Sequence, residues 1–183
     1  MRDPPVSRGA TVWLTGLSGA GKSTIADTVT GCLRAIGREV EVLDGDELRR
    51  SLSAGLGFSR ADRDTHVRRV GFVAELLARH GVVTLVPVIA PYATTRDEVR
   101  THHDAHGTTY LEVHVATPLA ECARRDVKKL YSQAAAGELT GLTGVDDPYE
   151  EPDKPDLRLD TTGLDVTATA RRVLDLLTER GVA

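Results

Sequence analysis

The segment GLSGAGKS at positions 16–23 fits the phosphate-binding pattern G-x-x-x-x-G-K-[ST]. Glycines in such a loop let backbone N–H groups turn inward around phosphate oxygens, and a helix starting near Lys22 adds the positive end of its dipole. Lys22 can neutralise β- and γ-phosphate oxygens, and the Ser23 hydroxyl can ligate Mg²⁺. Because an apolar strand precedes the loop, a bare helix-capping turn is the weaker interpretation, and we predict a nucleoside-triphosphate site. Its expected residues are Gly16, Leu17, Ser18, Gly19, Ala20, Gly21, Lys22, Ser23 and Thr24.

A second group with catalytic potential is the segment Asp44-Gly45-Asp46, which follows an apolar stretch directly. The carboxyl ends of strands in an open parallel sheet form the ligand crevice, so these carboxylates should face the phosphate loop. There they can hold Mg²⁺ or its water, or orient an accepting hydroxyl. The alternative is a polar turn in which Asp46 is a helix N-cap.

Arg63 begins a helical stripe that continues through Val67, Val70 and Ala74. An arginine at the start of an otherwise buried stripe indicates a cleft wall with an anionic partner. The alternative is a surface arginine whose aliphatic stem packs at a helix end.

The elements that must position these groups alternate between strands and helices. Apolar runs predict strands at 11–15, 39–43, 82–89, 109–116 and 156–160, and helical periodicity predicts helices over 22–37, from 59 onward and around 166–177. Such alternation favours right-handed crossovers and one three-layer α/β domain, 1–183, with a mostly parallel five-stranded sheet. Residues 127–155 break the rhythm, and we expect a lid at approximately 127–150.

Composition excludes several classes of protein. With 40% hydrophobic and 27% charged residues, the chain of 183 residues is typical of a globular protein. Its net charge of −4 argues against general nucleic-acid binding, and no apolar run suggests a membrane span. The N-terminus has no apolar export signal. Cys32 and Cys122 lie in helix-like apolar patterns, so we expect buried thiols and a cytoplasmic location.

The motifs together resemble the adenylylsulfate kinase (APS kinase) family, in family order over nearly the whole chain. The matching segments are WLTGLSGAGKST (13–24), LDGDELR (43–49), LGFSRADR (56–63), RRVGFVA (68–74), PY (91–92), TPLAECARRD (117–126), LY (130–131), TGVDDPYE (143–150) and LDTT (159–162). The resemblance implies a P-loop kinase fold and Mg²⁺-dependent transfer of the ATP γ-phosphoryl group to the 3′-hydroxyl of adenosine 5′-phosphosulfate. It also implies a homodimer and a functional link to an ATP sulfurylase.

The resemblance assigns roles position by position. Lys22, Asp44 and Asp46 would be catalytic, Ser23 and Asp44 would hold the metal, and Arg125 would touch the nucleotide. Arg49 and Arg63 would grip the phosphosulfate, Phe58 would stack on the acceptor adenine, and Lys128 would belong to the lid. The substrate-binding set implied in full is Asp46, Arg49, Phe58, Arg63, His66, Pro91, Tyr92, Lys128, Leu142, Thr143 and Gly144.

Departures from the family pattern lie on the acceptor side. Ala90 stands where many members have a serine proposed to be phosphorylated, so transfer here should be direct and in line. Ala93 replaces an arginine, His66 an asparagine and Leu142 a phenylalanine, and 132–135 also differ. Two alternatives therefore stay open: a related kinase for another small hydroxyl-bearing metabolite or nucleoside, and a catalytically poor nucleotide-binding regulator.

Other clusters have simpler interpretations. His102, His103 and His106 offer no carboxylate or cysteine partner in sequence, so a solvated helix end is favoured over a metal site. Acidic neighbours offset the arginine groups that would suggest nucleic-acid binding. Trp13 and His114 are expected in the core, and Tyr131 fits either the lid or the packing beneath it.

Overall fold

The computed structural model describes residues 8–183, so the N-terminal segment examined for an export signal lies outside the described residues. Five parallel strands form one sheet in the order β2-β3-β1-β4-β5. The strands are β1 (Ala10–Thr15), β2 (Val40–Val42), β3 (Val83–Pro87), β4 (Thr109–Val115) and β5 (Leu157–Leu159). The predicted sheet is confirmed, with shorter β2, β3 and β5 than expected.

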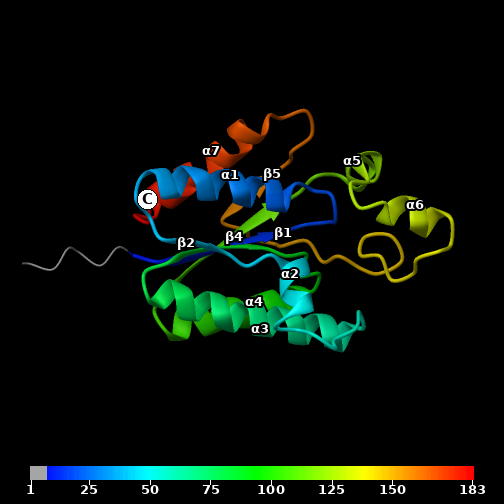
Figure 1. The fold of residues 1–183 in the computed structure, drawn as a ribbon, viewed down its shortest axis with the longest axis horizontal. Helices are drawn as coiled ribbons and strands as arrows, with labels where there is room; N and C mark the ends of the chain where they lie inside the picture. Colours follow the sequence, from blue (N-terminus) through cyan, green and yellow to red (C-terminus); the bar gives the residue numbers. More distant parts are fainter. Residues whose placement is uncertain (1–7) are drawn as a thin grey trace, which may run out of the picture.

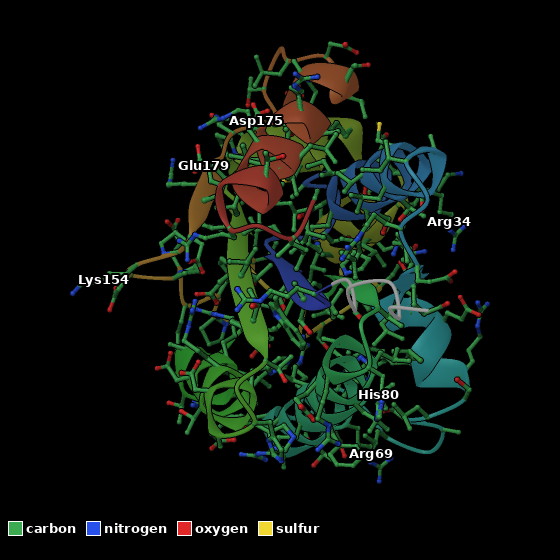
Figure 2. The ribbon with its side chains drawn as sticks, turned by 90° about the vertical axis from the view of Figure 1, so that its left-hand side faces the viewer. Arg34, Arg69, His80, Lys154, Asp175 and Glu179 are labelled. Atoms are coloured by element: carbon green, nitrogen blue, oxygen red, sulfur yellow. The ribbon has the colours of Figure 1, made fainter. Side chains whose placement is uncertain are left out.

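Helices cover both faces of the sheet (Figure 1). α1 (Lys22–Ala35) and α7 (Val166–Glu179) pack on one face, and α3 (Arg60–Arg79) and α4 (Ala93–Ala105) pack on the other. Figure 2 shows this layering from the side, with Asp175 and Glu179 on the outside of α7 and Arg69 at the opposite surface. The predicted three-layer α/β architecture is therefore confirmed.

The central strand β1 explains why its sequence lacks polar alternation. Val12 and Leu14 join the core beneath α1 and α7, whereas Trp13 joins the core beneath α3 and α4. A strand covered on both faces needs apolar side chains at successive positions. The same covering buries Trp13 and His114 fully or nearly so, as the sequence predicted.

Four helices were not predicted as elements: α2 (Gly45–Arg50), α4, α5 (Leu119–Arg125) and α6 (Leu130–Ala135). The buried side of α4 consists of Thr95, Arg96, Val99 and His103, so it gives almost no hydrophobic periodicity. The segment 127–150 contains α6 and a hydrogen-bonded turn, so it is structured over much of its length.

One expectation about α1 is wrong. Cys32 is exposed and only Cys122 is a buried thiol. Ile36, which follows the end of α1, is 65% exposed. Within residues 8–183, none of the helices combines the length and apolarity needed to cross a bilayer.

Candidate active site

The loop between β1 and α1 forms an open cradle of backbone N–H groups. Gly21 is the N-cap of α1 with φ of 103°, and no side chain caps the helix, which leaves its first N–H groups free for an anion. At Gly16, a Cβ atom would lie 2.4 Å from the carbonyl oxygen of Val115. Only glycine therefore lets the loop pass this close to β4.

Lys22 lies inside this loop rather than in solvent. Its Nζ donates hydrogen bonds to the carbonyl oxygens of Gly16 and Leu17 at 2.9 and 2.8 Å. Burial, and secondly repulsion from Lys128, lower the pKa of Lys22 from 10.5 to about 8. The ammonium is thus held without a carboxylate partner of its own, in a place where phosphate oxygens would stabilise its charged form.

Asp44 connects the phosphate loop to α2. Its Oδ2 accepts a hydrogen bond from Ser23 Oγ at 3.0 Å, and its Oδ1 accepts from the backbone N–H groups of Asp46 and Glu47 at 2.9 and 3.3 Å. Asp44, and not Asp46, is therefore the N-cap of α2. The Ser23 hydroxyl and this fixed carboxylate are hard oxygen ligands of the kind that Mg²⁺ prefers.

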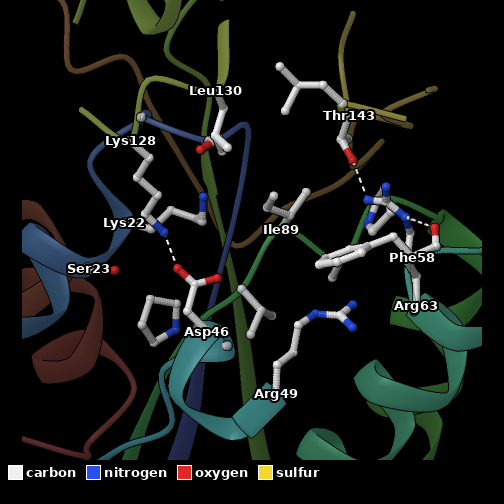
Figure 3. Close-up of a pocket in the computed structure, with 18 of the residues that line it drawn as sticks. Lys22, Ser23, Asp46, Arg49, Phe58, Arg63, Ile89, Lys128, Leu130 and Thr143 are labelled. Atoms are coloured by element: carbon white, nitrogen blue, oxygen red, sulfur yellow. Dashed lines mark hydrogen bonds and ion pairs between the residues drawn. The ribbon is translucent and has the colours of Figure 1, made fainter. Parts of the chain in front are cut away.

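Asp46 has a different environment from Asp44. Its side chain is 68% exposed, and its carboxylate forms an ion pair with Lys128 across the mouth of the site. Figure 3 shows Lys22 and Lys128 on one side of Asp46 and Arg49 on its other side. Asp46 is thus the more exposed of the two acids and is held by Lys128 rather than by Ser23, a difference that the sequence did not show.

Opposite the phosphate loop, two arginines flank an exposed aromatic ring. The guanidinium carbons of Arg49 and Arg63 lie 4.6 and 5.8 Å from the ring centre of Phe58, whose side chain is 68% exposed. Burial, and then repulsion from Arg63, lower the pKa of Arg49. Paired cations around an open aromatic face suit a ligand that carries both an anionic group and a planar ring.

His66 forms a neutral wall behind these arginines. Burial, and then the charge of Arg49, lower the pKa of His66 to about 4. Its Nδ1 lies 2.9 Å from Ser53 Oγ. His66 therefore contributes a hydrogen-bonding ring to the cavity and no positive charge at neutral pH.

Arg63 also fastens the lid. Its three nitrogens donate hydrogen bonds to Phe58 O at 2.7 Å, Thr143 Oγ1 at 2.6 Å and Gly141 O at 2.7 Å, and Nη2 lies 3.4 Å from Asp147 Oδ2. Arg63 thus joins α3 to the end of the lid, in addition to presenting its charge at the cavity wall.

Two further contacts hold the start of the lid. Tyr131 is buried, and its hydroxyl donates a hydrogen bond to Ser18 O in the phosphate loop at 2.8 Å. Arg125 donates to Thr161 Oγ1 and O at 2.9 and 3.0 Å and lies next to Gly21. Tyr131 therefore packs on the phosphate loop, and it does so from within the segment that the sequence predicts to be a lid.

One cavity of about 550 Å³ joins these groups. It brings together most of the predicted site residues: Ser18, Gly19, Gly21, Lys22, Ser23, Thr24, Asp44, Asp46, Arg49, Phe58, Arg63, His66, Pro91, Arg125, Lys128, Leu142 and Thr143. Five predicted residues are not in its wall: Gly16, Leu17, Ala20, Tyr92 and Gly144.

Tyr92 and Gly144 act behind the cavity wall. Tyr92 is 2% exposed, beneath the guanidinium of Arg60 at 4.3 Å, and its hydroxyl lies 3.4 Å from Asp147 Oδ2. Gly144 packs against Leu17, where a Cβ atom would meet the Leu17 side chain at 2.6 Å. Both residues support the lid rather than face a ligand.

Sequence reasoning assigned no role to the acids and tyrosine of the segment DDPYE (146–150). Asp146 accepts hydrogen bonds from the N–H groups of Gly141 and Leu142 at 2.6 and 2.7 Å. Tyr149 Oη lies 3.0 Å from Thr15 Oγ1, and Glu150 accepts from Ala93 N at 2.7 Å. The segment fixes the predicted lid to β1 and α4. The available signals were its match to the family segment TGVDDPYE and its density of polar residues after Gly144.

Comparisons with known proteins show the family to which this chain is related. The model of the family described as adenylylsulphate kinase matches residues 8–160. The chain belongs to the adenylylsulphate kinase family. The adenylyl-sulfate kinase of Deinococcus deserti is 54% identical over 94% of this chain and 93% of its own length. The predicted family, the P-loop kinase fold and the assignment as a kinase are confirmed.

Two solved structures of this family are similar to the chain. The Mycobacterium tuberculosis APS kinase CysC, in complex with AMPPNP and APS, has a TM-score of 0.91 and 49% identity, covering 96% of this chain and 99% of that one. A hexameric APS kinase from Thiobacillus denitrificans has a TM-score of 0.75 and 39% identity, and covers 98% of this chain but 30% of that one.

Proposed function

We propose that this chain transfers the γ-phosphoryl group of ATP to the 3′-hydroxyl of adenosine 5′-phosphosulfate, giving 3′-phosphoadenosine 5′-phosphosulfate. The proposal rests on one observation. A single cavity has the phosphate loop on one side and, on the other, two arginines beside an exposed phenylalanine ring. The names of relatives near half identity support the same acceptor.

On the donor side, the backbone of the phosphate loop and Lys22 would bind the ATP phosphates. Ser23 and Asp44 would hold Mg²⁺, since their hydrogen bond already places two oxygen ligands together. When bound, the ion neutralises charge on the triphosphate oxygens. Arg125, beside Gly21, would contact the nucleotide from the lid side.

On the acceptor side, Arg49 and Arg63 would face the phosphosulfate and Phe58 would stack on the adenine. Asp46 would accept the proton of the 3′-hydroxyl, because its carboxylate is exposed while both oxygens of Asp44 are engaged. Its present partner, Lys128, would then exchange the carboxylate for a phosphate oxygen. Removing the hydroxyl proton makes the oxygen a better nucleophile for in-line attack.

Direct transfer needs no phosphorylated enzyme side chain. Ala90, three residues beyond the end of β3, has no hydroxyl, and its carbonyl oxygen accepts a hydrogen bond from Arg96 Nη1 at 2.7 Å. The lid contacts of Arg63 and Tyr131 would keep water out of the closed cavity, so that phosphate passes to the acceptor rather than to water.

The assembly and location of the protein extend this proposal. A homodimer and a functional link to an ATP sulfurylase stay predictions from the family resemblance. The two free thiols, Cys32 and Cys122, fit a reducing compartment such as the cytoplasm.

The proposal is tested by ADP release from purified protein with ATP and Mg²⁺, with and without adenosine 5′-phosphosulfate. Lys22→Ala is the inactive control. We expect strong acceptor-dependent release that the control loses. ATP binding without acceptor-dependent release would exclude the named acceptor; a panel of other hydroxyl-bearing metabolites and nucleosides would then separate a related kinase from a nucleotide-binding regulator.

A further inference from the structure

A cluster of metal-binding side chains lies between α3 and α4, away from the cavity. Glu75 of α3 and His102 and His106 at the end of α4 each offer one ligand atom, and these atoms lie within 4.8 Å of one another. The sequence favoured a solvated helix end because no carboxylate was adjacent. His106 is indeed exposed at the end of α4, whereas His103 is buried, and the packing of α3 on α4 brings the carboxylate of Glu75 to His102 and His106.

The ring of His106 is oriented as metal-binding imidazoles usually are. Its Nδ1 lies 2.8 Å from the backbone carbonyl oxygen of His102. Because a carbonyl oxygen only accepts hydrogen bonds, Nδ1 carries the proton and Nε2 keeps its lone pair. A backbone carbonyl on the second ring nitrogen is the support that metal-ligating histidines typically have.

His102 has an unsatisfied ring nitrogen. Its Nε2 is buried without a hydrogen-bond partner and lies 3.8 Å from Glu75 Oε2. A buried polar atom left unpaired costs free energy, about 1–3 kcal/mol in proteins generally. A cation between Nε2 and Oε2 would satisfy both atoms.

Glu75 is held in place for such a ligand. Its side chain is 1% exposed, and Oε1 accepts a hydrogen bond from Thr108 Oγ1 at 2.9 Å. Arg79 Nε also lies on the Oε1 side, at 3.6 Å. The second oxygen, Oε2, is thereby turned towards the histidines.

We propose that Glu75, His102 and His106 form a site for a divalent transition-metal ion of the Zn²⁺ type, with a water as fourth ligand. Two imidazoles and one carboxylate are a common Zn²⁺ donor set. Zn²⁺ bonds of about 2.0–2.1 Å place tetrahedral ligand atoms about 3.3 Å apart. The three ligand atoms lie within 4.8 Å of one another, so each pair would have to move closer by at most about 1.5 Å to bind the ion. The exposed ring of His106 gives the ion access from solvent.

The site is separate from phosphoryl transfer. Glu75 is twelve positions beyond Arg63 on the same helix, which corresponds to about 18 Å at 1.5 Å per residue. A bound ion would instead join the end of α4 to α3, and so act as a brace for the layer that carries the acceptor wall.

The test is equilibrium binding of Zn²⁺ to untagged, chelator-treated protein in excess Mg²⁺, with Cys32→Ser as the parent to remove the exposed thiol. We expect one Zn²⁺ per chain and a Tm rise of about 5–10 °C at a hundredfold excess over Kd. His106→Ala should weaken binding at least about tenfold and abolish the Tm rise. Co²⁺ should give the strong visible absorption of a tetrahedral site in the parent alone.

Matched variants keep the proposal falsifiable. His80→Ala removes another exposed histidine at the end of α3 and should leave the affinity unchanged. Arg79→Met should tighten binding, because it removes a cation beside Glu75. Unchanged kinase turnover of His106→Ala in Mg²⁺ would show that the variant is folded. Equal Zn²⁺ affinity in parent and His106→Ala, or a parent Kd in the millimolar range, would overturn the proposal.

Discussion

The two walls of the cavity are built in different ways. The donor wall is one continuous segment, 16–24, whose own backbone and Lys22 supply most of its groups. The acceptor wall takes Arg49, Phe58 and Thr143 from separate segments. Arg63 bonds the backbone of Phe58 to Thr143, and Arg49 lies over the Phe58 ring. The donor wall should therefore resist remote substitutions, whereas the acceptor wall should respond to changes in the lid.

The largest effect is expected from Lys22→Ala, which removes the cation of the donor wall. Loss of this charge at the β- and γ-phosphates should lower kcat/KM by about 10³-fold in steady-state ADP release. Lys154→Ala removes an exposed lysine elsewhere and is the matched control. A Lys22→Ala enzyme that keeps near-parental kcat/KM would contradict the assigned role.

Asp46→Asn and Asp44→Asn test the different roles proposed for the two acids between the donor wall and the acceptor wall. Asp46→Asn keeps the shape of the side chain but removes the proton acceptor, so kcat should fall about 10²-fold while ATP affinity is kept. Asp44→Asn should instead raise the Mg²⁺ concentration needed for half-maximal rate, because Asp44 contacts Ser23. The reverse pattern would exchange the roles of the two acids.

Asp147→Asn weakens the fastening of the acceptor wall without touching the donor wall. The charge lost beside Arg63 is worth about 1.4 kcal/mol if it resembles other charged hydrogen bonds, so the KM for the acceptor should rise about tenfold. The KM for ATP should hardly change. Asp153→Asn, an exposed acid of the same loop, controls for net charge, and equal rises in both KM values would refute the separation of the walls.

The pH dependence of ATP-analogue binding should isolate Lys22. With its pKa lowered to about 8, the ligand-free enzyme loses the Lys22 proton between pH 7 and 9, and affinity should fall by up to about tenfold. Folding stability should change in the opposite direction: the unfolded chain, with the normal pKa of 10.5, binds more protons between about pH 8 and 10.5, so this group makes unfolding less favourable as pH rises. Titration and scanning calorimetry of the parent and of Lys22→Met measure the affinity and the folding stability as functions of pH. If parent and variant showed the same pH dependence, the pKa assigned to Lys22 would be wrong.

The smallest effect is expected from Tyr131→Phe, which removes one hydrogen bond between lid and phosphate loop. A typical bond of this kind contributes about 1 kcal/mol, so Tm should fall by about 3 °C and kcat/KM by about fivefold or less. Thermal unfolding and initial rates measure the two changes. A loss as large as that of Lys22→Ala would mean that the lid forms part of the donor wall.

The same contrast explains how much the sequence could predict. The phosphate loop is a local motif, and all of its elements follow from adjacent residues between β1 and α1. The three inner strands of the sheet were equally predictable because nearly all of their residues are buried and most are apolar. The residue-by-residue roles on the acceptor side came from family resemblance and stay predictions.

What escaped prediction depends on tertiary contacts. Asp44 and Asp46 look equivalent in sequence, and only the start of α2 separates the capping carboxylate of Asp44 from the exposed carboxylate of Asp46, which pairs with Lys128. Glu75 joins His102 and His106 through helix packing that no local pattern encodes. α4 escaped because polar side chains, among them Arg96 bonded to Glu112, form its buried face.

The two outer strands have a consequence for how copies of this chain meet. β2 and β5 have three residues each, whereas β1 and β4, nearer the centre, have six and seven. An outer strand exposes its unused backbone donors and acceptors to other molecules, and a long one can template intermolecular strand pairing. Outer strands this short offer few backbone groups with which a strand of another copy could pair. Self-association through strand addition is thereby disfavoured, and contacts between copies are left to helices and loops.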